Sequence, residues 1–442
     1  MNTPELLAPA GTPEHLETAF AYGADAVYAG QPRYSLRVRN NSFKDVAALG
    51  SGIARAHELG KQFYLVSNIA PHNNKVRSYL KDLEPVLKHK PDALILSDPG
   101  LIMLVREKWP DQPIHLSVQA NAVNWATVEF WRRQDISRVI LSRELALDEI
   151  REIRDRVPDM ELEVFVHGAL CMAYSGRCLL SGYMNHRDAN QGACTNACRW
   201  NYKEVRHSHD QTGDLITTCS DSGGVQDVEP KEILLEEPNR PGGFIPAYED
   251  EHGTYIMNSK DLRAVQHVAE LAKMGVHSLK IEGRTKSTYY VARTTQVYRR
   301  AIDEAVHGKP FDMNLMDELE ALSNRGYTEG FLRRHVPREY QSYEQGSSFL
   351  GTQQVVGTIT DTDDQWLTID VKNKFAPGDQ LELINPAGNI RFSASIMENR
   401  NGQTMDYAPG SGHIVRIPKP ADLPQTLEHS YLTKILPSAH SN

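Results

Sequence analysis

The sequence predicts an α/β fold in which eight parallel strands and their helices close into a (β/α)8 barrel of the TIM type. A small C-terminal antiparallel β-barrel domain follows it. Short aliphatic runs alternate with longer amphipathic stretches over the first three hundred residues, and eight such runs can be counted. Beyond residue 350 the pattern changes to short strands separated by turn sequences. An open doubly wound sheet is the alternative for the first part.

The predicted barrel strands are residues 5–8, 26–29, 62–67, 93–97, 114–118, 138–141, 162–166 and 278–281. Apolar residues spaced three and four apart predict the helices between them, such as Ile150, Ile153 and Val157 on one face. Thr12 and Pro13 occupy the cap and first turn of the first helix. After the seventh strand, an insertion over 168–255 precedes a helix expected to start near Asp261.

These boundaries predict four regions. The barrel with its insertion occupies residues 1–310, a linker 311–350, the β-domain 351–425 and a tail 426–442. The strands of the β-domain are expected between about 353 and 418, around the turns Pro-Gly-Asp and Pro-Ala-Gly-Asn. Its expected role is docking of RNA or protein, or a structural cap.

Composition is that of an ordinary globular protein, with 40% hydrophobic and 24% charged residues among 442. We find no leader with a basic and then an apolar region, and no apolar run long enough for a bilayer, so a cytoplasmic protein is expected. The net charge of −9 argues against indiscriminate nucleic-acid binding. An RNA partner would need a local basic patch.

Four of the five cysteines fall within 28 positions, in the spacing C-x6-C-x15-C-x3-C. They are Cys171, Cys178, Cys194 and Cys198. A disulfide framework explains this poorly in a reducing compartment. Four thiolates suit zinc or an iron-sulfur cluster, and the spacing is looser than the C-x2-C knuckles of structural zinc sites. The pattern therefore favours a cluster, and Cys219 is expected to be a spare thiol.

Polar residues follow the apolar part of several strands, where TIM barrels build their active sites. The predicted substrate-binding residues are Arg33, Arg37, Arg39, Asn68, His72, Gln119, Asn121, Arg143, Lys280 and Arg284. His167 and Glu282 are expected to act as acid or base. Guanidinium groups match carboxylates, although the arginine-rich loop after the second strand could equally be a solvated ion-pair network.

Hydrolytic motifs are absent from the sequence. The segment SDSGG at 220–224 is similar to a serine-protease nucleophile motif, but it lies in a polar insertion of an α/β chain without the fold that supplies histidine and aspartate. There is no HExxH helix and no G-x-S-x-G elbow.

Several segments carry a family resemblance: ELLAPAGTPEHLETAFAYGADAVYAG, YSLRVRNNSF, HGALCMAYSGRCLLSGY, GACTNACRW, SLKIEGR and NRGYTEGFL. They resemble the collagenase-like U-type peptidase family along nearly the whole chain, except about 208–244. For its tRNA-hydroxylating branch, the resemblance implies conversion of the wobble uridine to 5-hydroxyuridine with prephenate as co-substrate. It also implies a 4Fe-4S cluster on the four clustered cysteines. An electron donor is a further possible partner.

A tRNA substrate needs phosphate contacts and stacking surfaces for a splayed anticodon base. The expected RNA-binding residues are Arg284, Lys286, Arg293, Arg325, Arg333 and Arg334. The stacking candidates are Tyr174, Trp200 and Tyr327, and Tyr174 is also an expected catalytic residue. Two alternatives stay open: a peptidase, as the family name suggests, and a non-catalytic iron-sulfur scaffold that binds RNA.

Overall fold

The computed structural model describes residues 3–36, 42–170, 174–175, 207–209, 215–217, 231–236, 244–250, 253–255, 260–322, 324, 326–333 and 352–436. Within these ranges, a parallel barrel of eight strands confirms the predicted fold. In spatial order they are β1 (Glu5–Pro9), β2 (Ala26–Gly30), β3 (Gln62–Ser67), β4 (Ala93–Leu96), β5 (Ile114–Leu116), β6 (Arg138–Ile140), β7 (Glu161–Ala169) and β14 (Ser278–Ile281). Strand β14 pairs with both β1 and β7, so the sheet closes on itself.

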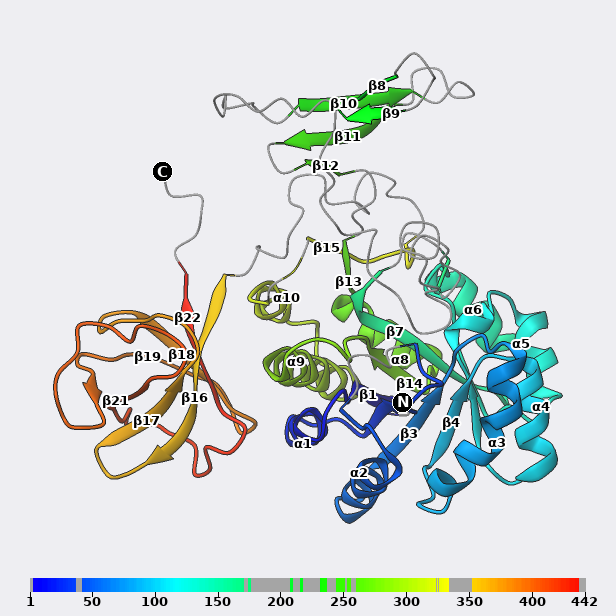
Figure 1. Ribbon diagram of the computed structural model, residues 1–442, viewed down its shortest axis with the longest axis horizontal. Coiled ribbons are helices and arrows are strands. Elements are labelled where there is room, and N and C mark those ends of the chain that lie inside the picture. The colour runs from blue at the N-terminus through cyan, green and yellow to red at the C-terminus, as the bar shows by residue number, and fades with distance from the viewer. Residues whose placement is uncertain are drawn as a thin grey trace.

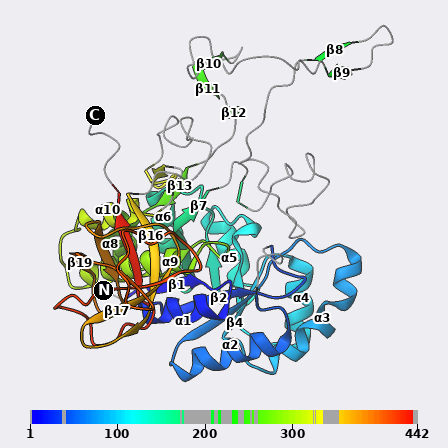
Figure 2. The same cartoon turned by 60° about the vertical axis from the view of Figure 1, so that its left-hand side comes forward.

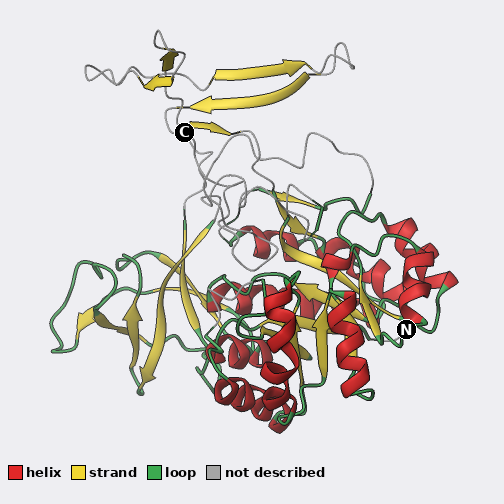
Figure 3. Ribbon diagram, turned by 45° about the vertical axis from the view of Figure 1, so that its right-hand side comes forward, coloured by secondary structure: helices red, strands yellow, loops and turns green. Residues whose placement is uncertain are grey.

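Helices surround this barrel, as the red coils around the yellow strands in Figure 3 show. They are α1 (Pro13–Ala21), α2 (Val46–Glu58), α3 (Asn73–Leu87), α4 (Pro99–Lys108), α5 (Trp125–Arg132), α6 (Leu147–Arg156), α8 (Val268–Met274), α9 (Thr288–Val306) and α10 (Asn314–Glu320). Helix α1 begins as predicted, because the Thr12 side chain accepts a hydrogen bond from the backbone N–H of His15 and Pro13 fills the first turn.

The helix expected near Asp261 begins later than predicted. Residues Asp261–Arg263 form strand β13, which runs antiparallel to the end of β7, and α8 starts only at Val268. Strand β7 extends three residues past its predicted end, so its last residues can pair with β13. Gly168 permits this: its φ is +114°, and a Cβ there would lie 2.6 Å from the Glu282 carbonyl oxygen. Tertiary pairing has overridden the helical periodicity of this segment.

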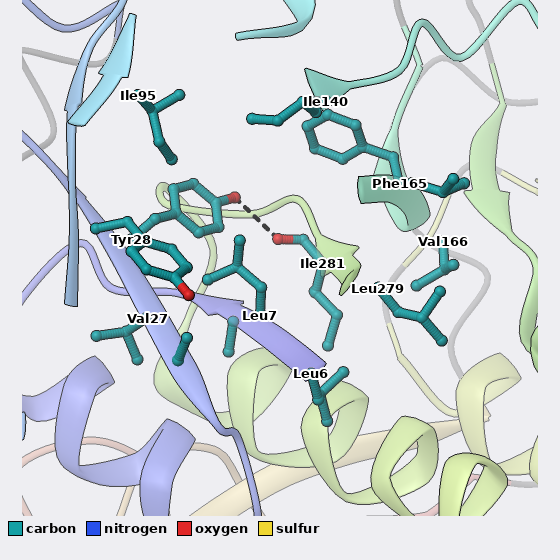
Figure 4. Packing of buried hydrophobic residues seen from close by; sticks show 14 of the residues in the cluster. Leu6, Leu7, Val27, Tyr28, Ile95, Ile140, Phe165, Val166, Leu279 and Ile281 are labelled. Atoms are coloured by element: carbon teal, nitrogen blue, oxygen red, sulfur yellow. Dashed lines mark hydrogen bonds between the residues drawn. The ribbon is translucent and has the colours of Figure 1, made fainter. Parts of the chain in front are cut away.

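Apolar side chains fill the space between the strands and the helices, and part of the barrel interior. Figure 4 shows this packing around Tyr28 and Phe165. The Tyr28 hydroxyl donates a hydrogen bond of 2.9 Å to the carbonyl oxygen of Ile281, which ties β2 to the end of β14. Leu6, Leu7 and Leu279 are fully buried. The core thus fixes the strand ends from which the site is built.

The C-terminal domain is one antiparallel sheet of seven strands, in the spatial order β19-β18-β22-β16-β17-β21-β20. The strands are β16 (Gln353–Thr362), β17 (Trp366–Val371), β18 (Gln380–Ile384), β19 (Ile390–Ser393), β20 (Glu398–Asn399), β21 (Ile414–Pro418) and β22 (Tyr431–Ile435). Strand β22 was not predicted, yet it lies in the middle of the sheet between β18 and β16. It was missed because it follows a long turn-rich stretch after residue 418.

The β-domain packs against helices α1 and α9 of the barrel, as Figure 2 shows. Tyr22 of α1 donates its hydroxyl to the carbonyl oxygens of Ile384 and His429, at 3.1 and 2.9 Å. Tyr289 of α9 meets Tyr431 of β22 edge to face, with ring centroids 5.7 Å apart. Buried contacts of this kind hold the two domains in one arrangement.

The insertion contributes two small antiparallel sheets to the described structure (Figure 1). Strand β8 (His207–His209) pairs with β9 (Leu215–Thr217), and β11 (Phe244–Asp250) lies between β10 (Lys231–Glu236) and β12 (Gly253–Tyr255). Several residues singled out from the sequence lie outside the described residues: Arg37, Arg39, Cys171, Cys178, Cys194, Cys198, Trp200, Cys219, Arg325 and Arg334. Among the described helices, none combines the length and the apolar character that crossing a membrane requires.

Candidate active site

The carboxyl ends of the barrel strands bring several predicted site residues together, and we call this end the mouth. Asn68, after β3, donates its amide to Gln119 Oε1 at 2.9 Å and to Ser117 Oγ at 3.2 Å. Its amide oxygen accepts the backbone N–H of Leu36 at 3.3 Å. Asn68 is buried, so its contacts position the loops after β2 and β5.

A second group of contacts ties the start of the insertion to the mouth. Asn121 donates its amide to the carbonyl oxygen of Ser175 at 2.8 Å. Glu144 Oε1 accepts the backbone N–H and the hydroxyl of Ser175 at 3.0 and 3.1 Å. Ser175 lies in sequence between Cys171 and Cys178. Ser175, which stands between two predicted ligands in the sequence, is therefore held beside the loops after β5 and β6.

Three cationic side chains gather around two aromatic rings at the mouth. The Arg143 guanidinium lies 3.9 Å from the Phe165 ring centroid, and Lys280 Nζ lies 5.3 Å from the same centroid. Lys280 Nζ is also 4.4 Å from the Tyr28 ring centroid, with the Arg284 guanidinium at 5.5 Å. Cations over ring faces are stabilised by the ring quadrupole. This part of the mouth favours an anionic ligand.

Below the mouth, the barrel interior holds an ion network instead of a purely apolar filling. Lys280 Nζ lies 2.7 Å from Glu163 Oε1, and Glu163 lies 3.4 Å from Arg138. Arg138 also meets Glu5 at 2.7 Å and Glu161 at 2.8 Å. We call Glu5, Arg138, Glu163 and Lys280 the interior ion network. Sequence reasoning found only Lys280, because charged residues in short strands normally indicate solvent-facing positions.

His167 does not face the barrel interior. Its ring lies among three tyrosines, with centroids 5.8 Å from Tyr290, 5.5 Å from Tyr298 and 5.5 Å from Tyr327. Burial, together with the positive charges of Lys286 and Arg263, lowers the pKa of His167 to about 3, so the imidazole is neutral at pH 7. Only 1% of the residue is exposed. This placement argues against the predicted role of His167 in proton transfer.

Glu282 and Tyr174 are the other predicted catalytic residues. Glu282 is half-buried directly after β14, and its negative charge contributes to a raised pKa of the Tyr28 hydroxyl, after the larger effect of burial. Tyr174, next to the fixed Ser175, is 58% exposed. His72, which was predicted to bind substrate, is exposed at the start of α3, and its side chain makes no capping hydrogen bond.

Two arginines that were predicted to bind substrate or RNA form ion pairs within the protein. Arg293 was expected to bind RNA, but it is 1% exposed and lies 3.2 Å from Glu318 and 3.7 Å from Glu382. That prediction is wrong, because the β-domain covers the face of α9 that carries Arg293. Arg33, expected to bind substrate, pairs with Asp82 of α3 at 2.8 Å, which matches the ion-pair alternative.

The remaining described members of the basic set differ in exposure. Arg333 is exposed and lies 3.5 Å from Glu329, a contact of little net strength at the surface. Lys286 lies 5.3 Å from the Tyr290 ring centroid. The Tyr327 ring is covered by the Arg263 guanidinium at 4.7 Å and by His167, which leaves Tyr327 a poor stacking surface.

Phe331 is a candidate binding residue that sequence reasoning missed. It is 39% exposed, and the carbonyl oxygen of the next residue, Leu332, accepts the backbone N–H of Leu147 at 3.0 Å. Glu144, three residues before Leu147, holds Ser175, the neighbour of Tyr174. The two exposed aromatic residues therefore flank the same β6–α6 loop. A lone phenylalanine in the sequence gives no signal that separates this position from a core position.

Comparison with known proteins identifies the family of this chain. The family model described as peptidase family U32 matches residues 11–342, and the model described as peptidase family U32 C-terminal domain matches residues 351–432. The chain belongs to peptidase family U32. Its two family matches cover the barrel and the β-domain, so the U32 architecture extends over both parts of the fold.

Curated U32 relatives cover nearly the full length of this chain. It is 61% identical to tRNA hydroxylation protein P of Escherichia coli strain K12, over 96% of this chain and 95% of the relative. It is 59% identical to tRNA hydroxylation protein P of Haemophilus influenzae, over 95% and 94%. It is 34% identical to tRNA hydroxylation protein P1 of Bacillus subtilis strain 168, over 93% and 91%. Relatives of this U32 protein thus carry a name that refers to tRNA modification.

Proposed function

We propose that this protein is a tRNA hydroxylase that converts the wobble uridine to 5-hydroxyuridine at the mouth of the barrel. The carrying observation is the 61% identity, over 96% of the chain, to a tRNA hydroxylation protein. The cationic and aromatic mouth supports the proposal, because an anticodon loop brings both phosphates and unstacked bases. Ser175 donates its hydroxyl to Glu144 at 3.1 Å, but this serine is 3% exposed and its backbone N–H binds the same carboxylate oxygen. It is therefore placed as a structural contact and gives no support to the peptidase alternative.

A 4Fe-4S cluster on Cys171, Cys178, Cys194 and Cys198 is part of the proposal. Their thiolates are the soft anionic ligands that such a cluster requires. Leu170 directly follows β7 and Ser175 is held by Glu144, and these two described residues flank Cys171 in the sequence, which supports a cluster near the mouth. When bound, the cluster would supply one-electron redox chemistry. An electron donor is then a necessary partner.

The residues of this chain have separable tasks in that reaction. Prephenate, rather than dioxygen, is proposed to be linked to the supply of the hydroxyl group, and cationic residues at the mouth bind its carboxylates. Phe165 and Tyr28 form apolar walls that exclude water from this region. Arg333 and Lys286 meet phosphates, while exposed aromatic rings stack on bases.

The direct test is analysis of tRNA nucleosides by mass spectrometry from cells that lack the endogenous gene. We expect 5-hydroxyuridine and its derivatives to return with the wild-type chain and with Cys219→Ala, but not with Cys178→Ala. Iron and sulfide in anaerobically purified protein should be about four each per chain in the first two. Absence of the nucleoside with wild-type chain would overturn the proposed function, and zinc without sulfide would overturn the cluster.

Replacing Phe331 with alanine should weaken binding of an anticodon stem-loop RNA. Stacking of one base on an aromatic ring contributes about 1–3 kcal/mol, so we expect an affinity loss of about 5- to 100-fold, measured by fluorescence anisotropy. Two other exposed aromatics serve as controls: Phe130, 54% exposed on α5, and Tyr407, 47% exposed in the β-domain. A larger loss for Tyr407→Ala than for Phe331→Ala would place the RNA on the β-domain instead.

A further inference from the structure

Burying a charged pair inside a barrel costs desolvation free energy, which is recovered only when each charge has a well-placed partner. Glu163 is completely buried, and the Lys280 side chain is 4% exposed. TIM-type barrels commonly fill this space with branched apolar residues. The interior ion network therefore marks Lys280 as a position where a positive charge is maintained at some cost in stability.

Lys280 has hydrogen-bonding capacity to spare. An ammonium group carries three donors. Among the residues that the structure describes, Glu163 is its one hydrogen-bond acceptor, at 2.7 Å. The rings of Tyr28 and Phe165 lie near the ammonium but offer only ring faces. Two N–H groups thus remain for a ligand that reaches the floor of the mouth.

Arg143 presents a second cation on the same aromatic ring. Within the described part of the chain, its guanidinium donates one hydrogen bond, to the carbonyl oxygen of Ala169 at 2.9 Å. The Arg143 guanidinium lies 3.9 Å and the Lys280 ammonium 5.3 Å from the Phe165 ring centroid. The two cationic groups are therefore no more than about 9 Å apart. One small molecule with two carboxylates can reach both.

We propose that Arg143 and Lys280 form a two-point site for a small dicarboxylate, and that Glu163 is the positioning residue that holds the Lys280 ammonium at the floor of the mouth. This inference rests on the proposed function, in which prephenate is the dicarboxylate. Arg138 and Glu5 do not contact the proposed ligand. Arg138 pairs with Glu163 and with Glu5, and in this way it helps to hold Glu163 in place. In this arrangement, both carboxylates of the ligand are bound without the arginine-rich loop after β2.

The surroundings of Lys280 predict how the site responds to pH. Burial lowers the pKa of Lys280, and the neighbouring carboxylate of Glu163 raises it in opposition. Among the described residues, the other titratable or charged groups of the interior and the mouth include Glu5, Tyr28, Tyr64, His115, Arg138, Arg143, Glu282 and Arg284. Arg138 and Arg284 lower the pKa of Lys280 further. Glu163 is thus the main influence that keeps the ammonium protonated.

The test is calorimetric titration of prephenate into the anaerobically purified full chain between pH 6.5 and 9. Lys280→Met and Arg143→Met should each weaken binding about ten- to a hundred-fold, the range of one charge-assisted contact. Glu163→Gln should bind as tightly as wild type at pH 6.5 and progressively more weakly as the pH rises, because Lys280 then loses its proton earlier. Glu161→Gln, an exposed carboxylate on the same Arg138, should follow wild type at every pH.

The outcomes separate this site from the proposed function. Equal affinity of wild type and Lys280→Met, or a Glu163→Gln curve parallel to wild type, would overturn the site. Nucleoside analysis of the same variants is independent: normal 5-hydroxyuridine without prephenate binding removes the site but keeps the function. If prephenate binds with the expected pH dependence but no modified nucleoside is formed, the site is kept and the proposed function is overturned. If Lys280→Met folds poorly, the double variant Glu163→Gln/Lys280→Met removes both buried charges and should show the same weakened binding.

Discussion

Replacing Arg138 with methionine is expected to destabilise the protein by about 3–5 kcal/mol, the usual cost of removing one partner from a buried ion network. The Arg138 side chain is 7% exposed and lies 2.7 Å from Glu5 and 3.4 Å from Glu163. Without it, Glu163 keeps Lys280 at 2.7 Å as its cationic partner, whereas Glu5 loses its ion-pair partner in the described interior. Urea unfolding followed by circular dichroism measures the loss.

Arg133→Met is the matched control for Arg138→Met. Arg133 also pairs with a glutamate, Glu129 at 2.8 Å, but its side chain is 71% exposed. Exposed pairs of this kind contribute little to stability, because solvent screens them. A loss for Arg138→Met as small as that for Arg133→Met would contradict the view that the interior ion network stabilises the barrel.

Replacing Arg293 with methionine should loosen the β-domain from the barrel, with a loss of about 3–5 kcal/mol. Arg293 lies on α9 with a 1% exposed side chain and contacts Glu318 of α10 and Glu382 of β18. Its removal leaves Glu382, which is 5% exposed, without its buried partner, although the exposed Arg391 remains 3.7 Å away. We expect hydrogen exchange to accelerate first in β18 and β22, the strands nearest the barrel.

Arg300→Met provides the control for Arg293→Met. Arg300 lies on the same helix and shares Glu318 at 2.6 Å, but its side chain is 41% exposed. Its ion-pair partners among the described residues, Glu318 and Asp312, both lie outside the β-domain. It should leave exchange in β18 and β22 unchanged. Acceleration spread evenly over the chain in Arg293→Met would indicate global destabilisation rather than release of the β-domain.

The sequence by itself determined the barrel, its strand count and the ring of polar strand ends. Buried parallel strands are short aliphatic runs, and these are visible without any tertiary knowledge. The strand at 278–281 was located although about 110 residues separate it from the strand before it. Asn68 and Gln119 were both predicted as site residues, and the structure brings them into contact.

Only the tertiary structure decided which charged residues face inward. Glu163 and Arg138 alternate with apolar neighbours in their strands, which in sequence looks the same whether the polar face meets water or the barrel interior. Closure of β14 onto β7 turns that face inward. Likewise, Arg293 looks like a surface residue of a basic helix until the β-domain covers it. Burial is a property of the packed neighbours, and a single strand or helix does not encode which neighbours arrive.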